Sequence, residues 1–370
     1  MNYITSEKII DSIITIQKAR NDIEAIAEKL GYKKIIVPTV FSIRYKKWQK
    51  PVQAYLYWKN ARIWNQTFER LEDGSSVIVQ VNFHNKCPNF HQVLKKHSKR
   101  LNFIVIIHDL ESLLFASDQT KSAGYKQHTL KNELNTLKYA KVVISHNAAM
   151  TKKLIELGVG AQKIIDLEIF DYLPSHQKSG QKKVQEKTLD IHFGSDIIIA
   201  GNLGPEKSPY ISKLHSIKGA NFNLYGFNLN QSCLSDNVKY FGNFTPEELL
   251  KNLSGSFGLI WDGTDIKTCK GHTGNYLRYN NPHKTSLYLS AGLPVIIWQS
   301  AALADFVKFH QIGFTIQSLT ELPEKLAQIT PADYDRMRKN AEIIGKQLNS
   351  GFFTKAALEK SRARLPLIDN

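Results

Sequence analysis

The stretch from Gly255 to Ile297, GSFGLIWDGTDIKTCKGHTGNYLRYNNPHKTSLYLSAGLPVII, decides the fold that we expect. Two apolar runs, Phe257–Trp261 and Pro294–Trp298, have the composition and length of buried strands. A helical pattern over Lys284–Ala291 lies between them and ends at Gly292. Strand, polar loop, helix and strand form one βαβ unit, which predicts a parallel sheet.

The loop after the first of these strands is long and cationic, and it leads directly into the helix. Ligands of open parallel sheets bind outside the carboxyl ends of the strands, and a helix N-terminus offers free backbone N–H groups. Without a metal ion, the charge on a diphosphate leaving group must be stabilised by Arg, Lys and such amides. Arg278 and Lys284 therefore predict a diphosphate seat, and the alternative is a solvated basic loop.

Three neighbouring residues have two interpretations each. Asn281 and Thr285 are candidates for neutral hydrogen-bond donors or for a cap of the helix. Asp262 directly follows the strand Phe257–Trp261. Its carboxylate either binds sugar or ribose hydroxyls or caps a turn with Gly263.

Length and composition limit the class of protein. A chain of 370 residues exceeds one ordinary core, which predicts two domains. The three cysteines are far apart and odd in number, which disfavours a disulfide framework and a zinc site. We expect a reduced, cytoplasmic protein, because the N-terminus has no secretory pattern and no apolar run is long enough to span a membrane. The net charge of +16 favours acidic partners without choosing among them.

Strand and helix patterns alternate on both sides of a polar, basic segment, Pro174–Lys187, which has linker composition. The fold class expected is α/β, with two Rossmann-like domains and a cleft between them. We place one domain at residues 1–185 and a second at residues 186–345. This architecture fits a GT-B glycosyltransferase, a two-domain reductase and a periplasmic-type binding protein equally well. Residues 346–370 are expected to form a helix that packs back toward the N-terminal domain.

The segment Phe41–Arg70 is rich in Trp, Tyr, Lys and Arg and predicts one or two amphipathic helices. Aromatic residues among basic ones occur where nucleic-acid bases stack. They also occur in helices that lie on an anionic bilayer, and in ordinary packing with the basic groups reaching to solvent. We favour ordinary packing, then the membrane surface, and expect no nucleic acid.

Two more strand ends carry candidate residues. The loop that begins at Gly201 and Asn202 lets a ligand approach the backbone, and Lys207 follows within reach of a phosphate. It lacks the glycine pattern of nicotinamide-binding and P-loop proteins. In the first half of the chain, His108, Asp109 and Glu111 follow the strand Phe103–Ile107. Asp109 or Glu111 is a candidate general base, and the alternatives are a helix cap for Asp109 and a buried structural role for His108.

Beyond these patterns, the chain resembles the bacterial β-1,6-galactofuranosyltransferases of polysaccharide biosynthesis. The resemblance rests on the long motif from Trp261 to Trp298 and the AALADFV that follows it, and on ARNDIEAIA, IHDLESL, VVISHNAAMTKKL, EIFDYL and AGNL in the same order. It extends from about Lys18 to Phe353. A weaker likeness connects the chain to the glucosyltransferases that elongate O-linked N-acetylglucosamine on serine-rich adhesins.

The resemblance implies a GT-B glycosyltransferase with UDP-galactofuranose as donor, inversion at the anomeric carbon and no metal or other cofactor. It implies that the donor set lies along UDP, with Tyr225 near the uracil or ribose. Asp109 is the expected base, with Glu111 second, and His108 and Arg20 lie on the acceptor side. The resemblance assigns the acceptor side to the N-terminal domain, residues 1–185, and the nucleotide sugar to the domain at 186–345. The donor set carried over from the family is Gly201, Asn202, Lys207, Tyr225, Asp262, Arg278, Asn281, Lys284 and Thr285.

The acceptor is left open among a glycan, a glycolipid and a glycoprotein. The positive charge suits an acceptor at the inner face of the cell membrane, with peripheral contact to anionic lipid. One alternative is a UDP-glucose or other UDP-hexose transferase acting on a glycoprotein. Another is a GT-B-like subunit that binds without catalysis. The oligomeric state, a homo-oligomer included, is also open.

Overall fold

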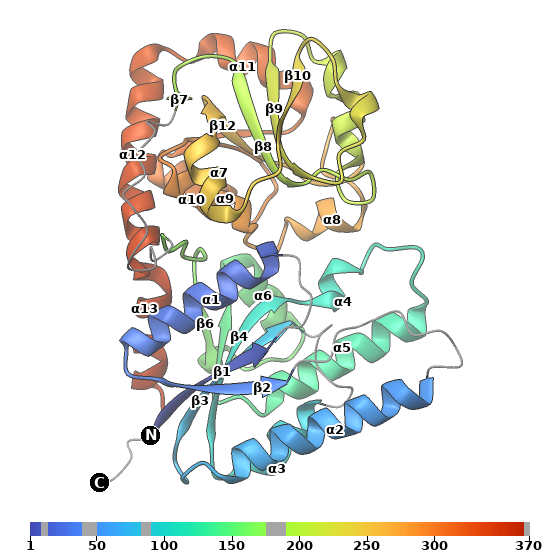
Figure 1. Ribbon diagram of the computed structural model, residues 1–370, viewed down its shortest axis with the longest axis vertical. Coiled ribbons are helices and arrows are strands. Elements are labelled where there is room, and N and C mark those ends of the chain that lie inside the picture. Colours follow the sequence, from blue (N-terminus) through green and yellow to red (C-terminus); the bar gives the residue numbers. More distant parts are fainter. Residues whose placement is uncertain (9–13, 39–49, 83–89, 175–189, 366–370) are drawn as a thin grey trace. The chain divides into compact units, whose positions relative to one another are not determined.

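The computed structural model describes residues 1–8, 14–38, 50–82, 90–174 and 190–365. The chain divides into two compact units. The first unit consists of Met1–Glu168 together with Phe353–Asn370, and the second is Ile169–Phe352. Figure 1 shows each unit as a sheet with helices packed along it.

Among its described residues, the first unit has six strands in one sheet, in the order β2-β1-β3-β4-β5-β6, and each neighbouring pair is parallel. The strands are β1 (Asn2–Lys8), β2 (Lys33–Pro38), β3 (Ser76–Asn82), β4 (Asn102–Asp109), β5 (Val142–Ser145) and β6 (Ile164–Asp166). The helices are α1 (Ile14–Lys29), α2 (Lys50–Glu69), α3 (Phe90–His97), α4 (Glu111–Leu114), α5 (Ala123–Lys138), α6 (Ala148–Glu156) and, from the end of the chain, α13 (Phe352–Ala363).

Apolar runs explain why the central strands form. All four residues of β5 are buried, as are the first six of β4. Successive side chains of a strand point to opposite faces, so continuous burial means that both faces of the sheet are covered. This is the arrangement that the alternating strand and helix patterns predict.

The C-terminal helix α13 completes the core of the first unit. Phe353, Ala357 and Leu358 are buried. Arg362 donates from Nη2 to the carbonyl of Leu30 at 2.5 Å, and its guanidinium lies 4.7 Å from the ring centroid of Tyr32. The first unit is therefore assembled from both ends of the described chain.

Within the described residues, the second unit has a six-stranded parallel sheet in the order β10-β9-β8-β12-β13-β14, and a short parallel pair, β11 with β7. Its strands are β7 (Asp190–Ile191), β8 (Asp196–Asn202), β9 (Asn221–Phe227), β10 (Val238–Gly242), β11 (Ser254–Gly255), β12 (Phe257–Ile260), β13 (Val295–Trp298) and β14 (Gly313–Ile316). Its helices are α7 (Pro246–Asn252), α8 (Gly271–Tyr276), α9 (His283–Ser290), α10 (Ala304–His310), α11 (Leu322–Gln328) and α12 (Pro331–Ser350), with a 3₁₀ helix, η4, at Pro209–Ser216.

The strand order of the second unit locates its switch point. Without the short pair, the strands follow the sequence 3-2-1-4-5-6, the order of dinucleotide-binding sheets. The order reverses between β8 and β12, which pair directly. In such sheets a crevice opens outside the carboxyl ends of the two strands at this point, and ligands bind there.

Two glycines allow the close contacts around this point. Gly226 has φ +142°, and a Cβ there would lie 1.8 Å from the carbonyl oxygen of Gly201. At Gly258 in β12, a Cβ would lie 2.2 Å from the ring of Tyr288, so glycine lets α9 pack directly on the strand. A side chain at either position would push the elements apart.

The structure also differs from the sequence predictions in several elements. Strand β1 was not predicted, because Asn2–Lys8 carries few apolar residues, although Ile4 is fully buried between neighbouring strands. The loop expected after Trp261 contains the helix α8. The described part of the aromatic and basic segment is a single helix, α2. Residues 39–49, and all of the predicted linker except Pro174, lie outside the described residues.

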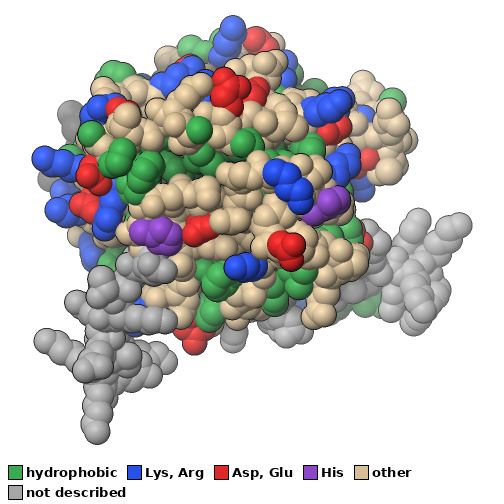
Figure 2. All heavy atoms as spheres, turned by 90° about the horizontal axis from the view of Figure 1, so that it is seen from above, with side chains coloured by type: hydrophobic (Ala, Val, Ile, Leu, Met, Phe, Trp, Pro, Cys, Tyr) green, Lys and Arg blue, Asp and Glu red, His purple; other side chains and the backbone are tan. Residues whose placement is uncertain are grey.

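The positive net charge of the chain does not make every face of the molecule uniformly basic. On the face in Figure 2, Lys and Arg side chains lie among Asp and Glu side chains, and neither sign forms a continuous field. Mixed charge of this kind serves solubility and does not select an anionic partner.

Candidate functional site

The candidate site of the second unit lies at the carboxyl ends of β8 and β12. Gly201 and Asn202 end β8, and Trp261 and Asp262 follow β12. Because the two strands are paired and parallel, both ends meet at one edge of the sheet. The sequence predicted Gly201, Asn202 and Asp262 separately, and the strand pairing brings their backbones together.

Asn202 organises the loop that leaves β8. Its side-chain oxygen accepts a hydrogen bond from the backbone N–H of Gly204 at 3.0 Å, and its carbonyl accepts one from the hydroxyl of Ser208, also at 3.0 Å. The amide of Asn228 is 3.4 Å from the same side-chain oxygen. These bonds fix the turn, so the Asn202 side chain has a structural role in this structure.

The most specific contact at the site is an ion pair between Lys284 and Asp262. The ammonium of Lys284 lies 2.9 Å from Oδ1 of Asp262 and donates to the carbonyl of Trp261 at 2.9 Å. The Lys284 and Asp262 side chains are 15% and 9% exposed. An ammonium has three N–H donors, and two of them are used in these bonds.

Lys284 is the second residue of α9, whose first turn lies at this same edge. Pro282 is the N-cap residue, and no side chain among the described residues caps the helix. A helix cap, one of the two roles considered for Asn281 and Thr285, is therefore not formed. An uncapped helix start leaves backbone N–H groups and a partial positive charge available to an anion.

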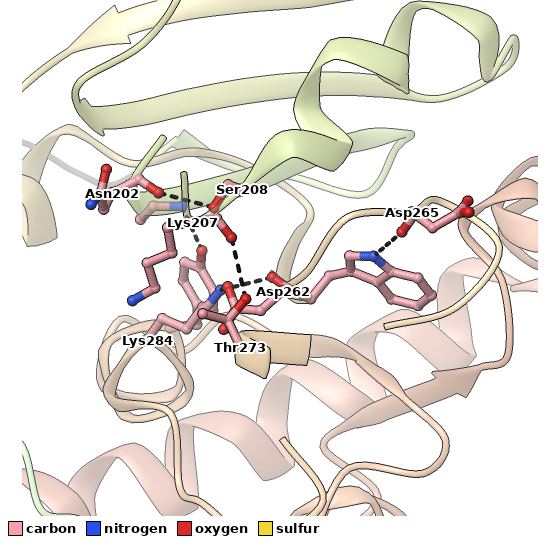
Figure 3. Close-up of polar contacts among 10 residues, drawn as sticks. Asn202, Lys207, Ser208, Asp262, Asp265, Thr273 and Lys284 are labelled. Atoms are coloured by element: carbon pink, nitrogen blue, oxygen red, sulfur yellow. Dashed lines mark hydrogen bonds and ion pairs between the residues drawn. The ribbon is translucent and has the colours of Figure 1, made fainter. Parts of the chain in front are cut away.

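Lys207 and Thr273 extend this cluster. Lys207 is exposed, and its carbonyl accepts a hydrogen bond from the Thr273 hydroxyl at 3.5 Å. Figure 3 shows the loop after β8, with Asn202, Lys207 and Ser208, gathered against Asp262, Thr273 and Lys284. The structure thus places two lysines, one exposed and one half-buried, on elements that meet at the switch point.

Arg278 packs against Trp298, a contact that its place in the sequence did not indicate. Its guanidinium lies over the ring of Trp298, 4.5 Å from the centroid, and the residue is exposed. A cation–π contact of this kind holds the side chain without neutralising its charge. Arg278, Lys284 and Asp262 all act electrostatically on the buried thiol of Cys269. Burial is the main reason that the pKa of this thiol is raised well above its usual range.

Besides Asp262, three of the predicted donor residues are buried. Tyr225 in β9 is fully buried, its hydroxyl accepts from the N–H of Ser254 at 3.0 Å, and its ring stacks on Phe241. Its side chain presents no surface to a uracil or ribose in this structure. Asn281 is 4% exposed and Thr285 is fully buried. The Thr285 hydroxyl has no hydrogen-bond partner among the described residues.

The sequence reasoning missed two tyrosines beside the site. Tyr288 of α9 accepts a hydrogen bond from the N–H of Ala200 at 2.7 Å, which ties the helix to β8. Tyr210 of η4 is fully buried, and its hydroxyl has no partner within the described part of the chain. Burial and the nearby Asp262 raise the Tyr210 pKa well above its usual range. Neither position carried a local sequence signal, because their contacts span distant elements.

The segment that opens the second unit supports the start of α9. The hydroxyl of Ser286 donates to the carbonyl of Phe170 at 2.6 Å. The rings of Phe170 and Tyr172 lie 6.3 Å and 5.2 Å from the ring of His283. The motif EIFDYL therefore has a physical role, which is to hold the first turn of α9 in place.

The first unit carries its own polar cluster at the carboxyl ends of its strands. His108 and Asp109 end β4, and Nε2 of His108 lies 2.8 Å from the side-chain oxygen of Gln80. Arg20 of α1 is buried, and its Nη1 lies 3.3 Å from Oε1 of Glu7. Burial lowers the pKa of Arg20 to about 10, and the charges of Glu24 and Asp109 oppose that shift. The structure thus brings Arg20 and Asp109 close enough to interact.

Glu111, the second candidate base, is the first residue of α4 and is buried. Its neighbour Glu133 of α5 accepts hydrogen bonds from the backbone N–H and the hydroxyl of Ser112. Burial, together with the charge of Glu111, raises the pKa of Glu133 to about 7. Two acidic side chains therefore lie close together behind the end of β4.

Two further features bear on function. The described residues hold no group of three or more His, Cys, Asp or Glu side chains placed to bind a metal ion. No helix in the same part of the chain combines the length and apolar character needed to cross a bilayer.

Comparison with known protein families shows to which family the chain belongs. The model of the glucosyltransferase 3-like N-terminal domain matches residues 1–169, and that of the C-terminal domain matches residues 197–361. The chain belongs to the glucosyltransferase 3-like family. It is a glycosyltransferase, which confirms the predicted class of enzyme.

Two curated relatives span most of the chain. The chain is similar to the β-1,6-galactofuranosyltransferase WbbI of Escherichia coli K12, with 37% identity over 275 residues, or 73% of each chain. It is 26% identical to glucosyltransferase 3 of Streptococcus gordonii over 259 residues, or 69% of each chain. The predicted resemblance to the galactofuranosyltransferases, and the weaker one to the glucosyltransferases, is confirmed.

Solved structures support the fold. The Anabaena protein HepE in complex with UDP-glucose aligns with a TM-score of 0.57 over 99% of this chain and 100% of its own, at 12% identity. Sucrose-phosphate synthase from Thermosynechococcus elongatus aligns with a TM-score of 0.60 over 98% and 97%, also at 12% identity. Together with the two parallel sheets, these neighbours confirm the GT-B fold.

Proposed function

We propose that this protein transfers galactofuranose from UDP-galactofuranose to a hydroxyl of a glycan acceptor, in the synthesis of a surface polysaccharide. The observation that carries the choice of sugar is the 37% identity to a β-1,6-galactofuranosyltransferase over 73% of the chain. The donor half of the proposal is supported independently by a cationic site at the sheet's switch point.

The donor site has the chemistry that a leaving nucleoside diphosphate needs. As the bond between the sugar C1 and the diphosphate oxygen breaks, the electron pair and its negative charge move onto UDP. Lys284, the uncapped start of α9 and the exposed Lys207 are groups that stabilise such charge. We propose that UDP binds at this edge of the second unit and that no metal ion takes part.

Lys284 is already held in position before the donor arrives. Its contacts with Asp262 and the Trp261 carbonyl orient the ammonium, so little side-chain freedom remains to be lost on binding. We propose that Asp262 acts first as this positioning partner. A carboxylate has two acceptor oxygens, so Asp262 can hold Lys284 through Oδ1 and accept a hydrogen bond from a donor hydroxyl at the same time.

The reaction that we propose is a single displacement with inversion. The acceptor oxygen attacks C1 as the bond to UDP breaks, and the acceptor proton passes to a carboxylate of the enzyme. We propose Asp109 as that base, because it ends β4 beside His108 and interacts electrostatically with Arg20. Glu111 is the second choice, since it is buried at the start of α4.

A UDP-glucose donor is the second candidate. The Streptococcus relative is named a glucosyltransferase, and HepE was solved with UDP-glucose. The residues that we propose for the nucleotide diphosphate do not distinguish the two sugars. The higher identity to the galactofuranosyltransferase therefore decides our order of preference.

A donor screen tests the sugar. The purified protein is incubated with UDP-galactofuranose, UDP-galactopyranose, UDP-glucose and UDP-N-acetylglucosamine, and UDP release is measured without an acceptor. We expect slow hydrolysis of UDP-galactofuranose alone. Hydrolysis of UDP-glucose instead would select the second candidate, and binding of UDP without turnover of any donor would favour a subunit that binds without catalysis.

The Asp109→Asn variant tests the base. We expect UDP affinity to remain unchanged while transfer falls by roughly 10²–10⁴-fold, the usual contribution of a general base. Glu111→Gln serves as the comparison, because it removes the other nearby carboxylate. Full transfer by Asp109→Asn would move the base to Glu111 or to another residue.

A further inference from the structure

The first half of α2 is a helix without a buried face. Among the residues from Pro51 to Lys59 none is buried, although six of the nine are Val, Ala, Tyr, Leu or Trp. Val52, Tyr55 and Trp58 are 53%, 58% and 57% exposed. Spacings of three residues place these side chains on one side of the helix. A face this apolar on an exposed helix indicates a partner.

The second half of the same helix is anchored. Asn60, Trp64 and Phe68 are buried, and Trp64 packs against Phe90 of α3 with ring centroids 5.0 Å apart. Figure 1 shows α2 beside α3 in the first unit. The helix is therefore fixed to the core at its C-terminal end, and this anchor presents the exposed turns in a defined orientation.

The charge of the exposed face is positive. Lys59 and Arg62 are exposed on the same side as Tyr55 and Trp58, and the Arg62 guanidinium lies 5.6 Å from the centroid of the Trp58 ring. The one acidic residue in the sequence of α2 is Glu69, at its far end, where it pairs with Lys96 at 2.6 Å. The apolar side chains are thus flanked by cations that no carboxylate of this helix compensates.

These properties favour a lipid surface over other partners. Trp and Tyr rings prefer the boundary between headgroups and acyl chains, and Lys and Arg beside them attract anionic headgroups. A second copy of this chain that used the same face would bring two positively charged faces together, and such like-charge contact is unfavourable. Proteins bind single-stranded nucleic acid in positively charged grooves lined by aromatic rings, whereas these rings and cations lie along one side of a single helix.

We propose that the exposed face of α2, defined by Val52, Tyr55, Trp58, Lys59 and Arg62, docks on a membrane that contains anionic phospholipid. The aromatic side chains enter the headgroup layer and the two cations contact phosphates. This contact is peripheral, and it holds the first unit where a lipid-linked acceptor would be found. It is independent of the nucleotide site in the second unit.

Sedimentation with vesicles tests the proposal. The full chain is mixed with vesicles of phosphatidylcholine containing phosphatidylglycerol, and with vesicles of phosphatidylcholine alone. We expect binding to the first and little to the second, with affinity that falls as salt is added. Each cation near an anionic surface strengthens binding about fivefold, so Lys59→Gln with Arg62→Gln should weaken it roughly 25-fold.

A second variant removes the aromatic contribution without changing charge. Tyr55→Ser with Trp58→Ser should reduce binding to the anionic vesicles, because the rings no longer enter the headgroup layer. The matched control is Lys308→Gln with Phe309→Ser on α10, which removes an exposed cation and an aromatic side chain that is 81% exposed. The control should bind as the unmodified protein does, and UDP should stabilise every variant equally against heat.

Several results would overturn the proposal. One is the absence of sedimentation with anionic vesicles at low salt, and another is equal loss of binding in the α10 control. If light scattering shows a dimer that Tyr55→Ser with Trp58→Ser abolishes, the face belongs to a second copy. If a short oligonucleotide competes with the vesicles for wild type, the face binds nucleic acid. None of these results would bear on UDP binding or donor turnover.

Discussion

Replacing Lys284 with Met would test the proposed diphosphate seat most directly. Met keeps most of the side-chain volume and removes the ammonium, which now contacts Asp262 and the carbonyl of Trp261, each at 2.9 Å. If the ammonium also contacts the diphosphate, a charge-assisted hydrogen bond of about 1.5–3 kcal/mol is lost. The Kd for UDP should then rise roughly 10–150-fold.

The assay compares UDP with uridine by calorimetry. Uridine has no phosphate, so its affinity should be the same in wild type and Lys284→Met if the lysine serves the diphosphate. The matched control is Lys339→Met, because Lys339 is an exposed lysine of α12 in the same unit. This control should leave both affinities unchanged.

Stability must be separated from binding in this variant. The Asp262 side chain is 9% exposed, and loss of its partner leaves a mostly buried charge, at a cost of about 3 kcal/mol or more. Lys284→Met combined with Asp262→Asn removes both charges, so stability should recover while UDP affinity stays low. The reasoning is refuted if Lys284→Met binds UDP as wild type does, or if UDP and uridine lose affinity equally.

Two other changes give distinct outcomes. Thr285→Val replaces a buried hydroxyl that has no partner among the described residues, so the free energy of unfolding should rise by about 1 kcal/mol in thermal or urea denaturation. A lower free energy of unfolding would mean that the hydroxyl has a hydrogen-bond partner. Weaker UDP binding by the variant would assign the hydroxyl to the ligand. Glu133 has a pKa raised to about 7, so the folded state keeps a proton that the unfolded state releases above its lower pKa. Stability should therefore fall by about 3 kcal/mol as pH rises from the unfolded pKa through 7, and Glu133→Gln should abolish this fall. Identical pH dependence of unfolding in both proteins would contradict the assignment.

The sequence predicts the strands well where they are continuous apolar runs. β5 and β13 were predicted because parallel strands covered on both faces need apolar residues at every position. β1 was not predicted, because its sequence, NYITSEK, is mostly polar. Its place between β2 and β3 comes from pairing with strands that are distant in the sequence. The order 3-2-1-4-5-6 also depends on such pairing, and no local pattern encodes it.

The sequence predicted the strands and the helix around the candidate site better than it predicted the contacts between their side chains. Strand ends and a helix start indicated Asn202, Asp262 and Lys284 as candidates. The structure places all three at one edge of the sheet, because loops at the carboxyl edge of a parallel sheet converge. The partner of each side chain could not be predicted. Lys284 pairs with a residue 22 positions away, and the guanidinium of Arg278 lies over the ring of Trp298. Tyr225 is an aromatic residue in a strand of the site, as a residue that contacts a nucleotide base would be. Its burial against Phe241 appears in the structure and has no signal in the local sequence.

The assembly of the first unit from both ends of the chain has a consequence for biosynthesis. Residues up to Glu168 leave the ribosome long before α13 does, and the whole second unit is translated in between. The surface around Tyr32 and Leu30 that receives Arg362 therefore stays uncovered during most of translation. We expect the nascent first unit to mature only after the second, and to depend on chaperones during that interval.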